Sequence, residues 1–187
     1  MTQFDSLALH QALTVLGNVL ADKNLHFEVV AIGGGGLLLL GMITRPTKDV
    51  DLVALVDHGS FVSAEKLPRP LLEAIAEVGR ALHLGESWVN AGPFELFTMG
   101  LPEGFADRMS TYFYGGLTLH LAGRFDQICF KLYASVDQGP QSKHFADLKS
   151  LKPTQAELQR AAAWCKIHDV SEGFAANLSE AIVSLGV

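Results

Sequence analysis

The hydrophobic residues in the first two thirds of the chain follow helical and strand-like periods in turn. Leucines at every third or fourth position indicate helices, and short runs of β-branched and aromatic residues indicate strands. The elements predicted in this way are residues 4–21 (helix), 26–32 (strand), about 35–42 (short buried helix), 48–56 (strand) and 70 to about 82 (helix). The pattern from Gly85 to Gly100 is irregular and predicts no regular element. Residues 109–114 and 117–122 predict a hairpin that turns at Gly115-Gly116.

The last third of the chain has only helical patterns, interrupted at Gly139-Pro140 and at Pro153. Helices are expected at about 125–135, 143–150, 154–168 and 173–185. The order of elements therefore predicts an α+β fold, with a mixed sheet flanked by helices and a helical C-terminal third. We expect one domain over residues 1–187, with an α/β core at about 1–122 and a helical part at 123–187.

Composition narrows the class of protein. The chain has 187 residues, is 49% hydrophobic and carries a formal net charge of -6, so it lacks the broad basic surface of a nucleic-acid binder. No apolar run reaches the roughly 18 residues that span a bilayer, and the N-terminus has no basic leader segment. A cytoplasmic protein with no membrane contact is expected. Cys129 and Cys165 lie among apolar neighbours and are expected to be buried thiols.

The segment GGGGLLLLGMITRPTKDVDLVAL, residues 33–55, holds the candidate chemistry. Side chains at i and i+2 of a strand point to the same face, so Asp49 and Asp51 predict two neighbouring carboxylates. Two such charges repel unless a cation lies between them. Mg²⁺ suits this site, because it takes one or two protein carboxylates together with substrate phosphates.

The glycines before this strand indicate where phosphates would lie. Gly33 and Gly34 follow a strand and open a helix, where backbone N–H groups can face an anion. Arg45 and Lys48 are close in sequence and can neutralise phosphate oxygens. Each feature alone has a simpler explanation, since strand-edge carboxylates are often solvated and glycine pairs often serve close helix packing. The combination, in this order, favours a nucleotide site.

The order strand, Gly-Gly, short helix, Arg-x-Thr-x-Asp-x-Asp resembles the nucleotidyltransferase superfamily of the polymerase-β type. AIGGGGLLLLGMITRPTKDVDLVAL is similar to its bacterial AbiEii-like branch, and FDQICFKLYAS…KHFADLKSL resembles two later helical motifs of that branch. SWVN and GLPEGFADR resemble segments of its small single-domain members. The resemblance covers roughly residues 25–152 and implies a nucleotidyltransferase-like sheet.

The resemblance also implies roles for single residues. Asp49 and Asp51 would be the metal carboxylates, and Gly33 and Gly34 would lie against the triphosphate. Lys131 matches a phosphate-contacting lysine and Asp147 matches an acidic position of the last motif, so all four charged residues would be catalytic. The implied reaction is Mg²⁺-dependent transfer of a nucleotidyl group to a hydroxyl of RNA or protein, as in a toxin that is paired with an antitoxin.

Several observations leave alternatives open. The family has Ser or Thr directly after the glycine pair, where this chain has Gly35, and the later strand offers His120 in place of a third carboxylate. Lys131 in an apolar helix can instead extend its amine to solvent, and Asp147 can be a surface charge four residues from Lys143. An active enzyme, a degenerate nucleotide- or partner-binding member of the same fold, and a helical interaction module therefore remain as three hypotheses. Zinc, hydrolase-triad, Walker and Rossmann motifs are not found in the sequence.

Overall fold

The structure is a computed structural model in which residues 3–186 are described. The chain forms two compact units. The sheet unit extends to Leu101 and includes Met109–Ala122, and the helical unit comprises Pro102–Arg108 and the chain from Gly123 onward. No helix of the described residues is long and apolar enough to cross a membrane.

The sheet unit contains six strands and four helices among its described residues. In chain order the elements are α1 (Ser6–Asp22), β1 (Phe27–Ile32), α2 (Gly33–Leu39), β2 (Val50–Asp57), β3 (Ser60–Ser63), α3 (Arg69–Ala81), β4 (Val89–Asn90), α4 (Phe94–Met99), β5 (Ser110–Tyr114) and β6 (Leu117–Leu121). The strand order is β3-β2-β1-β6-β5. β6 is parallel to β1, and β2 is antiparallel to it, so the sheet is mixed.

One edge of β2 is shared by two short strands. β3 pairs antiparallel with the second half of β2, from Ala54 to Asp57. β4 pairs parallel with the start of β2, where Val50 lies opposite Val89 and Asp51 lies opposite Asn90. The first residues of β2 therefore have β1 on one side and β4 on the other.

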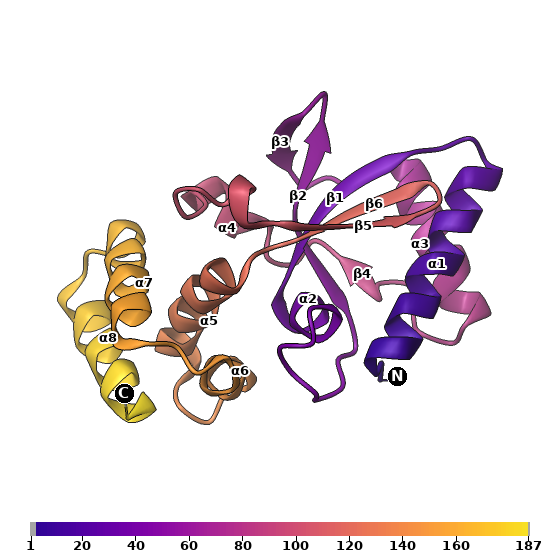
Figure 1. The fold of residues 1–187 in the computed structure, drawn as a ribbon. Helices are drawn as coiled ribbons and strands as arrows, with labels where there is room; N and C mark the ends of the chain where they lie inside the picture. The colour runs from indigo at the N-terminus through magenta and orange to yellow at the C-terminus, as the bar shows by residue number, and fades with distance from the viewer. Residues whose placement is uncertain (1–2, 187) are drawn as a thin grey trace. The chain divides into compact units, whose positions relative to one another are not determined.

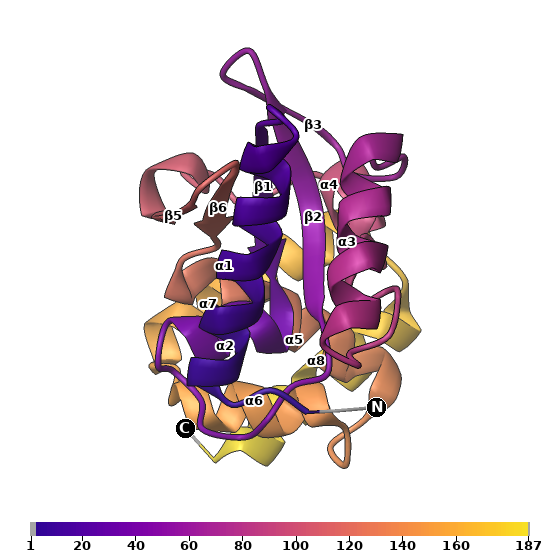
Figure 2. The ribbon, with the colours of Figure 1, turned by 90° about the vertical axis from the view of Figure 1, so that its right-hand side faces the viewer.

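Helices α1 and α3 lie side by side on one face of the sheet (Figures 1 and 2). Their leucines pack against alternate strand residues, so Leu13 of α1 and Leu71 of α3 lie close to Val50 and Leu52 of β2. Because successive side chains of a strand point to opposite faces, Asp51 points to the other face, away from α1 and α3. Burial of the leucine face supplies most of the stabilisation, at about 25 cal/mol per Å² of apolar area.

The helical unit contains a 3₁₀ turn, Ala106–Arg108, and four helices: α5 (Arg124–Gln138), α6 (Lys143–Leu151), α7 (Gln155–His168) and α8 (Glu172–Leu185). α5 contacts each of the other three helices. Side-chain caps begin three of them: Ser142, Thr154 and Ser171 each accept a backbone N–H of the first turn. In α7 the cap is reciprocal, because Glu157 also accepts the N–H of Thr154.

The structure confirms the predicted α+β class with a mixed sheet, and the predicted elements lie within a few residues of the observed ones. Helix α1 begins at a cap, because the Asp5 side chain accepts the N–H of Ala8 at 2.8 Å. The sequence did not predict strands β3 and β4. The irregular stretch from Gly85 to Gly100 contains β4 and α4. Both cysteines are buried free thiols, as predicted.

Candidate functional site

The candidate site lies where β1 ends beside the start of β2. Asp51 pairs with Ile32, the last residue of β1. Gly33 follows at a φ of +75°, a left-handed conformation that favours glycine. A Cβ on Gly33 would lie 2.7 Å from Oδ2 of Asp51. The Gly33 backbone thus lies beside the Asp51 carboxylate, and a side chain at position 33 would meet it.

The second glycine, Gly34, lies next to the guanidinium of Arg45. A Cβ on Gly34 would be 3.0 Å from Nη2 of Arg45 and 3.2 Å from Oγ1 of Thr47. Arg45 is half-buried, and its Nη1 donates to the carbonyl of Pro46 at 3.3 Å. Thr47 is buried, and its backbone pairs with that of Phe4. The segment between α2 and β2 therefore folds back over the glycines and brings the Arg45 guanidinium to them.

Gly35 is enclosed by backbone. A Cβ at this position would lie 2.8 Å from the carbonyl oxygen of Asp49 and 3.3 Å from Cα of Val50. Both are backbone atoms, so they cannot rotate away as a flexible side chain would. The Ser or Thr that the resemblance leads one to expect at position 35 does not fit this backbone without a shift of the segment that carries Asp49.

Asp49 and Lys48 lie outside the strand. β2 begins at Val50, two residues later than predicted, so Asp49 immediately precedes it. Asp49 is half-buried and Lys48 is exposed. The carbonyl of Asp49 accepts a hydrogen bond from Oγ1 of Thr47 at 3.3 Å, which holds the backbone of the Asp-x-Asp segment against the turn. The shared strand face assumed for the two aspartates is therefore not established by strand geometry.

Asn90 is a neighbour of Asp51 that the sequence prediction missed as a site residue. Its Nδ2 donates to Oδ1 of Asp51 at 3.3 Å, across the parallel pair of β4 and β2. Asn90 lies in a stretch with no periodic pattern. The segment SWVN, which ends at Asn90, resembles small single-domain members of the AbiEii-like branch, but that resemblance implied no role for Asn90.

His120 lies on the same face of the sheet but farther along it. Its Nε2 lies 2.5 Å from Oε1 of Glu28, and its Nδ1 lies 2.9 Å from Oγ1 of Thr111. His120 pairs with Val30 on β1, two residues before the Ile32 that pairs with Asp51. Glu28 is four residues before Ile32, or about 13 Å along a strand. The imidazole thus bridges Glu28 and Thr111, and Glu28 lies too far along β1 to supply a third carboxylate beside Asp51.

Lys131 and Asp147 belong to the helical unit, and they form an ion pair with each other. Lys131 Nζ lies 2.7 Å from Asp147 Oδ2, and their side chains are 4% and 1% exposed. The pair joins α5 to α6. The structure therefore excludes both simpler alternatives, an amine extended to solvent and a surface carboxylate. The ion pair gives both residues a structural role, because it links α5 to α6. Their catalytic role stays a prediction.

A second buried carboxylate in this unit was not predicted. Asp126 is fully buried and accepts two hydrogen bonds from Arg108, 3.0 Å from Nε and 2.6 Å from Nη2. Burial raises the pKa of the Asp126 carboxyl, although the guanidinium opposes this effect. The same hydrogen bonds raise the pKa of Arg108. Because two parallel N–H groups hold the carboxylate, we regard the pair as ionised at neutral pH. No motif spacing links these two residues, so only the fold reveals them.

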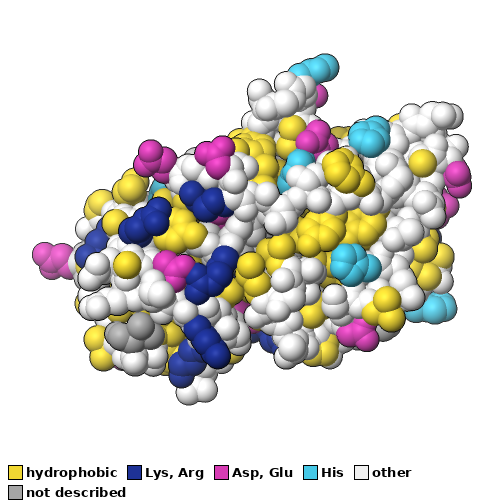
Figure 3. Space-filling view, in the orientation of Figure 1, with side chains coloured by type: hydrophobic (Ala, Val, Ile, Leu, Met, Phe, Trp, Pro, Cys, Tyr) yellow, Lys and Arg dark blue, Asp and Glu magenta, His cyan; other side chains and the backbone are white. Residues whose placement is uncertain are grey.

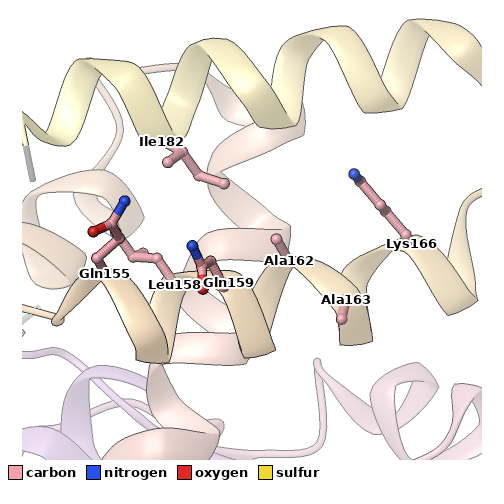
Figure 4. A pocket seen from close by; sticks show the side chains of 7 residues that line it. All are labelled: Gln155, Leu158, Gln159, Ala162, Ala163, Lys166 and Ile182. Atoms are coloured by element: carbon pink, nitrogen blue, oxygen red, sulfur yellow. The ribbon is translucent and has the colours of Figure 1, made fainter.

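The described part of the helical unit also has a cationic surface and a pocket between two of its helices. Lys and Arg side chains gather over this unit on the face that Figure 3 shows. A pocket of about 380 Å³ lies between α7 and α8, lined by Gln155, Leu158, Gln159, Ala162, Ala163, Lys166 and Ile182 (Figure 4). Its polar groups are exposed side chains of α7. Burial raises the pKa of the Cys129 thiol to about 12 and that of Cys165 further, so neither is a reactive thiolate.

The donor atoms at the candidate site suit a hard cation. Asp49 and Asp51 supply carboxylate oxygens, and the nearby groups are an amide, a hydroxyl and a guanidinium. This set fits Mg²⁺ with a bound phosphate better than it fits a softer metal. Within residues 3–186, no three His, Cys, Asp or Glu side chains are grouped so as to hold a metal without other ligands. A cation at Asp49 and Asp51 would thus take its other ligand oxygens from water or a substrate. No protein-family model, curated protein or solved structure matches this chain.

Proposed function

We propose that this chain binds a nucleoside triphosphate together with Mg²⁺ at the junction of β1 and β2, and transfers a nucleotidyl group to a hydroxyl of RNA or protein. The observation that supports it most is the contact of Gly33 with Asp51. A left-handed glycine at the end of one strand lies against a carboxylate at the start of the next, and Arg45 lies over the following glycine. Packing alone does not require a carboxylate there.

The residues of the site have separate tasks in this proposal. Asp49 and Asp51 hold the cation, which would polarise the α-phosphate and orient the attacking hydroxyl. Gly33 and Gly34 let the phosphates approach the backbone. Arg45 neutralises phosphate oxygens, with Lys48 as an exposed second cation. The new bond joins the acceptor oxygen to the α-phosphorus while the bond to the β-phosphate breaks, so pyrophosphate leaves and the proton of the acceptor hydroxyl passes to water.

The test is a thermal shift with each nucleoside triphosphate, with Mg²⁺ and with EDTA. At a ligand concentration 100 times Kd, binding to the folded state adds about 2.7 kcal/mol, which raises Tm by roughly 5–10 °C in a chain of this length. Asp51→Asn should abolish the shift. Asp57→Asn is the matched control, because Asp57 lies at the exposed far end of the same strand and should keep the full shift. A shift that survives in Asp51→Asn places the nucleotide elsewhere.

A specific observation favours a second candidate, a member of the same fold that binds nucleotide without transferring it. His120 replaces the third carboxylate and is held by Glu28 and Thr111, and Gly35 leaves no room for the hydroxyl expected after the glycine pair. Incubation with α-labelled triphosphate and total RNA or protein separates the two candidates. Label transfer that depends on Asp51 indicates an enzyme, and a thermal shift without label transfer indicates a binding protein.

A further inference from the structure

The two-residue strand β4 has a specific construction. The N–H of Val50 donates to the carbonyl of Trp88 at 2.8 Å. Trp88 is buried, and its indole N–H donates to the carbonyl of Ile75 of α3. Val89 then points into the core between the sheet and α3. By strand alternation, Asn90 points to the opposite face, which is the face of Asp51. Trp88 and Val89 thus anchor the segment, and Asn90 is the polar residue that it presents.

The orientation of the Asn90 amide follows from its second contact. Its Oδ1 accepts the N–H of Gly92 at 2.8 Å. An N–H group needs an acceptor, so the amide oxygen is on the Gly92 side and the NH₂ group is on the Asp51 side. The assignment of Nδ2 as the donor to Oδ1 of Asp51 therefore rests on the hydrogen-bond network.

The two oxygens of Asp51 consequently have different surroundings. Oδ1 accepts from Asn90, and Oδ2 lies on the side of Gly33, 2.7 Å from the position of a Cβ there. A carboxylate held at one oxygen cannot turn freely about its terminal bond. Its other oxygen therefore keeps a fixed direction.

We propose that Asn90 is a positioning residue that holds Oδ1 of Asp51 so that Oδ2 is directed to a divalent cation at the Gly33 turn. This inference rests on the proposed function, because it assumes that Asp51 binds the cation. Partners of metal-binding carboxylates typically change metal affinity by 10- to 100-fold when they are removed. Asn90 does not touch the substrate in this proposal and acts through Asp51.

The experiment measures Mn²⁺ affinity, with and without a nucleoside triphosphate, by titration calorimetry. Asn90→Ala should weaken binding by 10- to 100-fold, because alanine has no donor for Oδ1 of Asp51. Asn18→Ala, on the exposed side of α1, is the control and should bind as tightly as the unchanged protein. In an Asp51→Asn background, Asn90→Ala should add no further loss, whereas a general structural effect would add its own.

A crystal structure of Asn90→Ala provides the readout that does not depend on metal. The Asp51 carboxylate should be rotated or spread over several orientations. If Asp51 keeps its orientation, or if Asn90→Ala binds Mn²⁺ with unchanged affinity, the positioning role is wrong and the proposed function stands. If the unchanged protein binds no Mn²⁺ with any triphosphate, the proposed function fails, and the cation role of Asn90 fails with it.

Discussion

The buried Lys131–Asp147 pair allows a prediction whose magnitude follows from the structure. At a separation of 2.7 Å, the attraction of two unit charges is about 6 kcal/mol at an effective dielectric constant of 20. Removing both groups from water costs a similar amount, so the pair as a whole contributes little net stability. Removal of one partner is different, because the other charge then stays buried without its counterion.

We therefore expect Lys131→Met to lower the free energy of unfolding by about 3–5 kcal/mol, which is the usual cost of breaking a buried pair. Lys131→Met combined with Asp147→Leu should recover most of that loss, since two apolar side chains that pack against each other need no counterion. Lys166→Met, at an exposed position of α7, is the control and should change stability by less than about 0.5 kcal/mol.

Urea denaturation followed by circular dichroism measures these differences. The chain has two compact units, so the helical signal is fitted with separate transitions if the curve is not a single step. A loss below about 1 kcal/mol for Lys131→Met, or a double variant no more stable than the weaker single variant, would refute the argument. A catalytic role alone would leave stability unchanged and reduce only activity.

Two further predictions concern the Gly35 backbone and the Glu157 carboxylate. Gly35→Ser should lower the unfolding free energy by about 1–3 kcal/mol, because its Cβ meets the Asp49 carbonyl at 2.8 Å, whereas Gly173→Ser, with open space around it, should cost far less; equal Tm values for the two variants would contradict this. Burial raises the pKa of Glu157, but hydrogen bonds from Thr154 and Arg124 outweigh it, so the pKa is lowered overall. The unfolded chain then binds the proton more readily, so this stabilisation is full above the ordinary pKa of 4.5 and is lost as the pH falls through the folded value. Stability measured from pH 6 to pH 3 should fall less steeply in Glu157→Gln than in the unchanged protein, and equal slopes in the two proteins would contradict this.

The sequence alone determined most of the secondary structure. Helix α1 has a long helical period, strands β1 and β2 are runs rich in β-branched residues, and caps such as Asp5 and Thr154 act on the backbone within three residues of themselves. Such local effects can be read without knowing the fold. The neighbourhood of Gly33 and Asp51 was also predictable, because a short helix between two strands that pair returns the second strand to the end of the first.

The tertiary structure decided the features that depend on contacts distant in sequence. β4 has only two residues, too few for a period, and it is a strand because β2 offers it a pairing edge and Trp88 anchors it. The contact of Asn90 with Asp51 joins residues 39 positions apart. Lys131 and Asp147 have surface-type side chains in an amphipathic pattern, and only the packing of α5 against α6 buries them together. The stability of a buried charged or polar group depends on which charges and backbone atoms surround it. The order of residues along the chain does not contain that information.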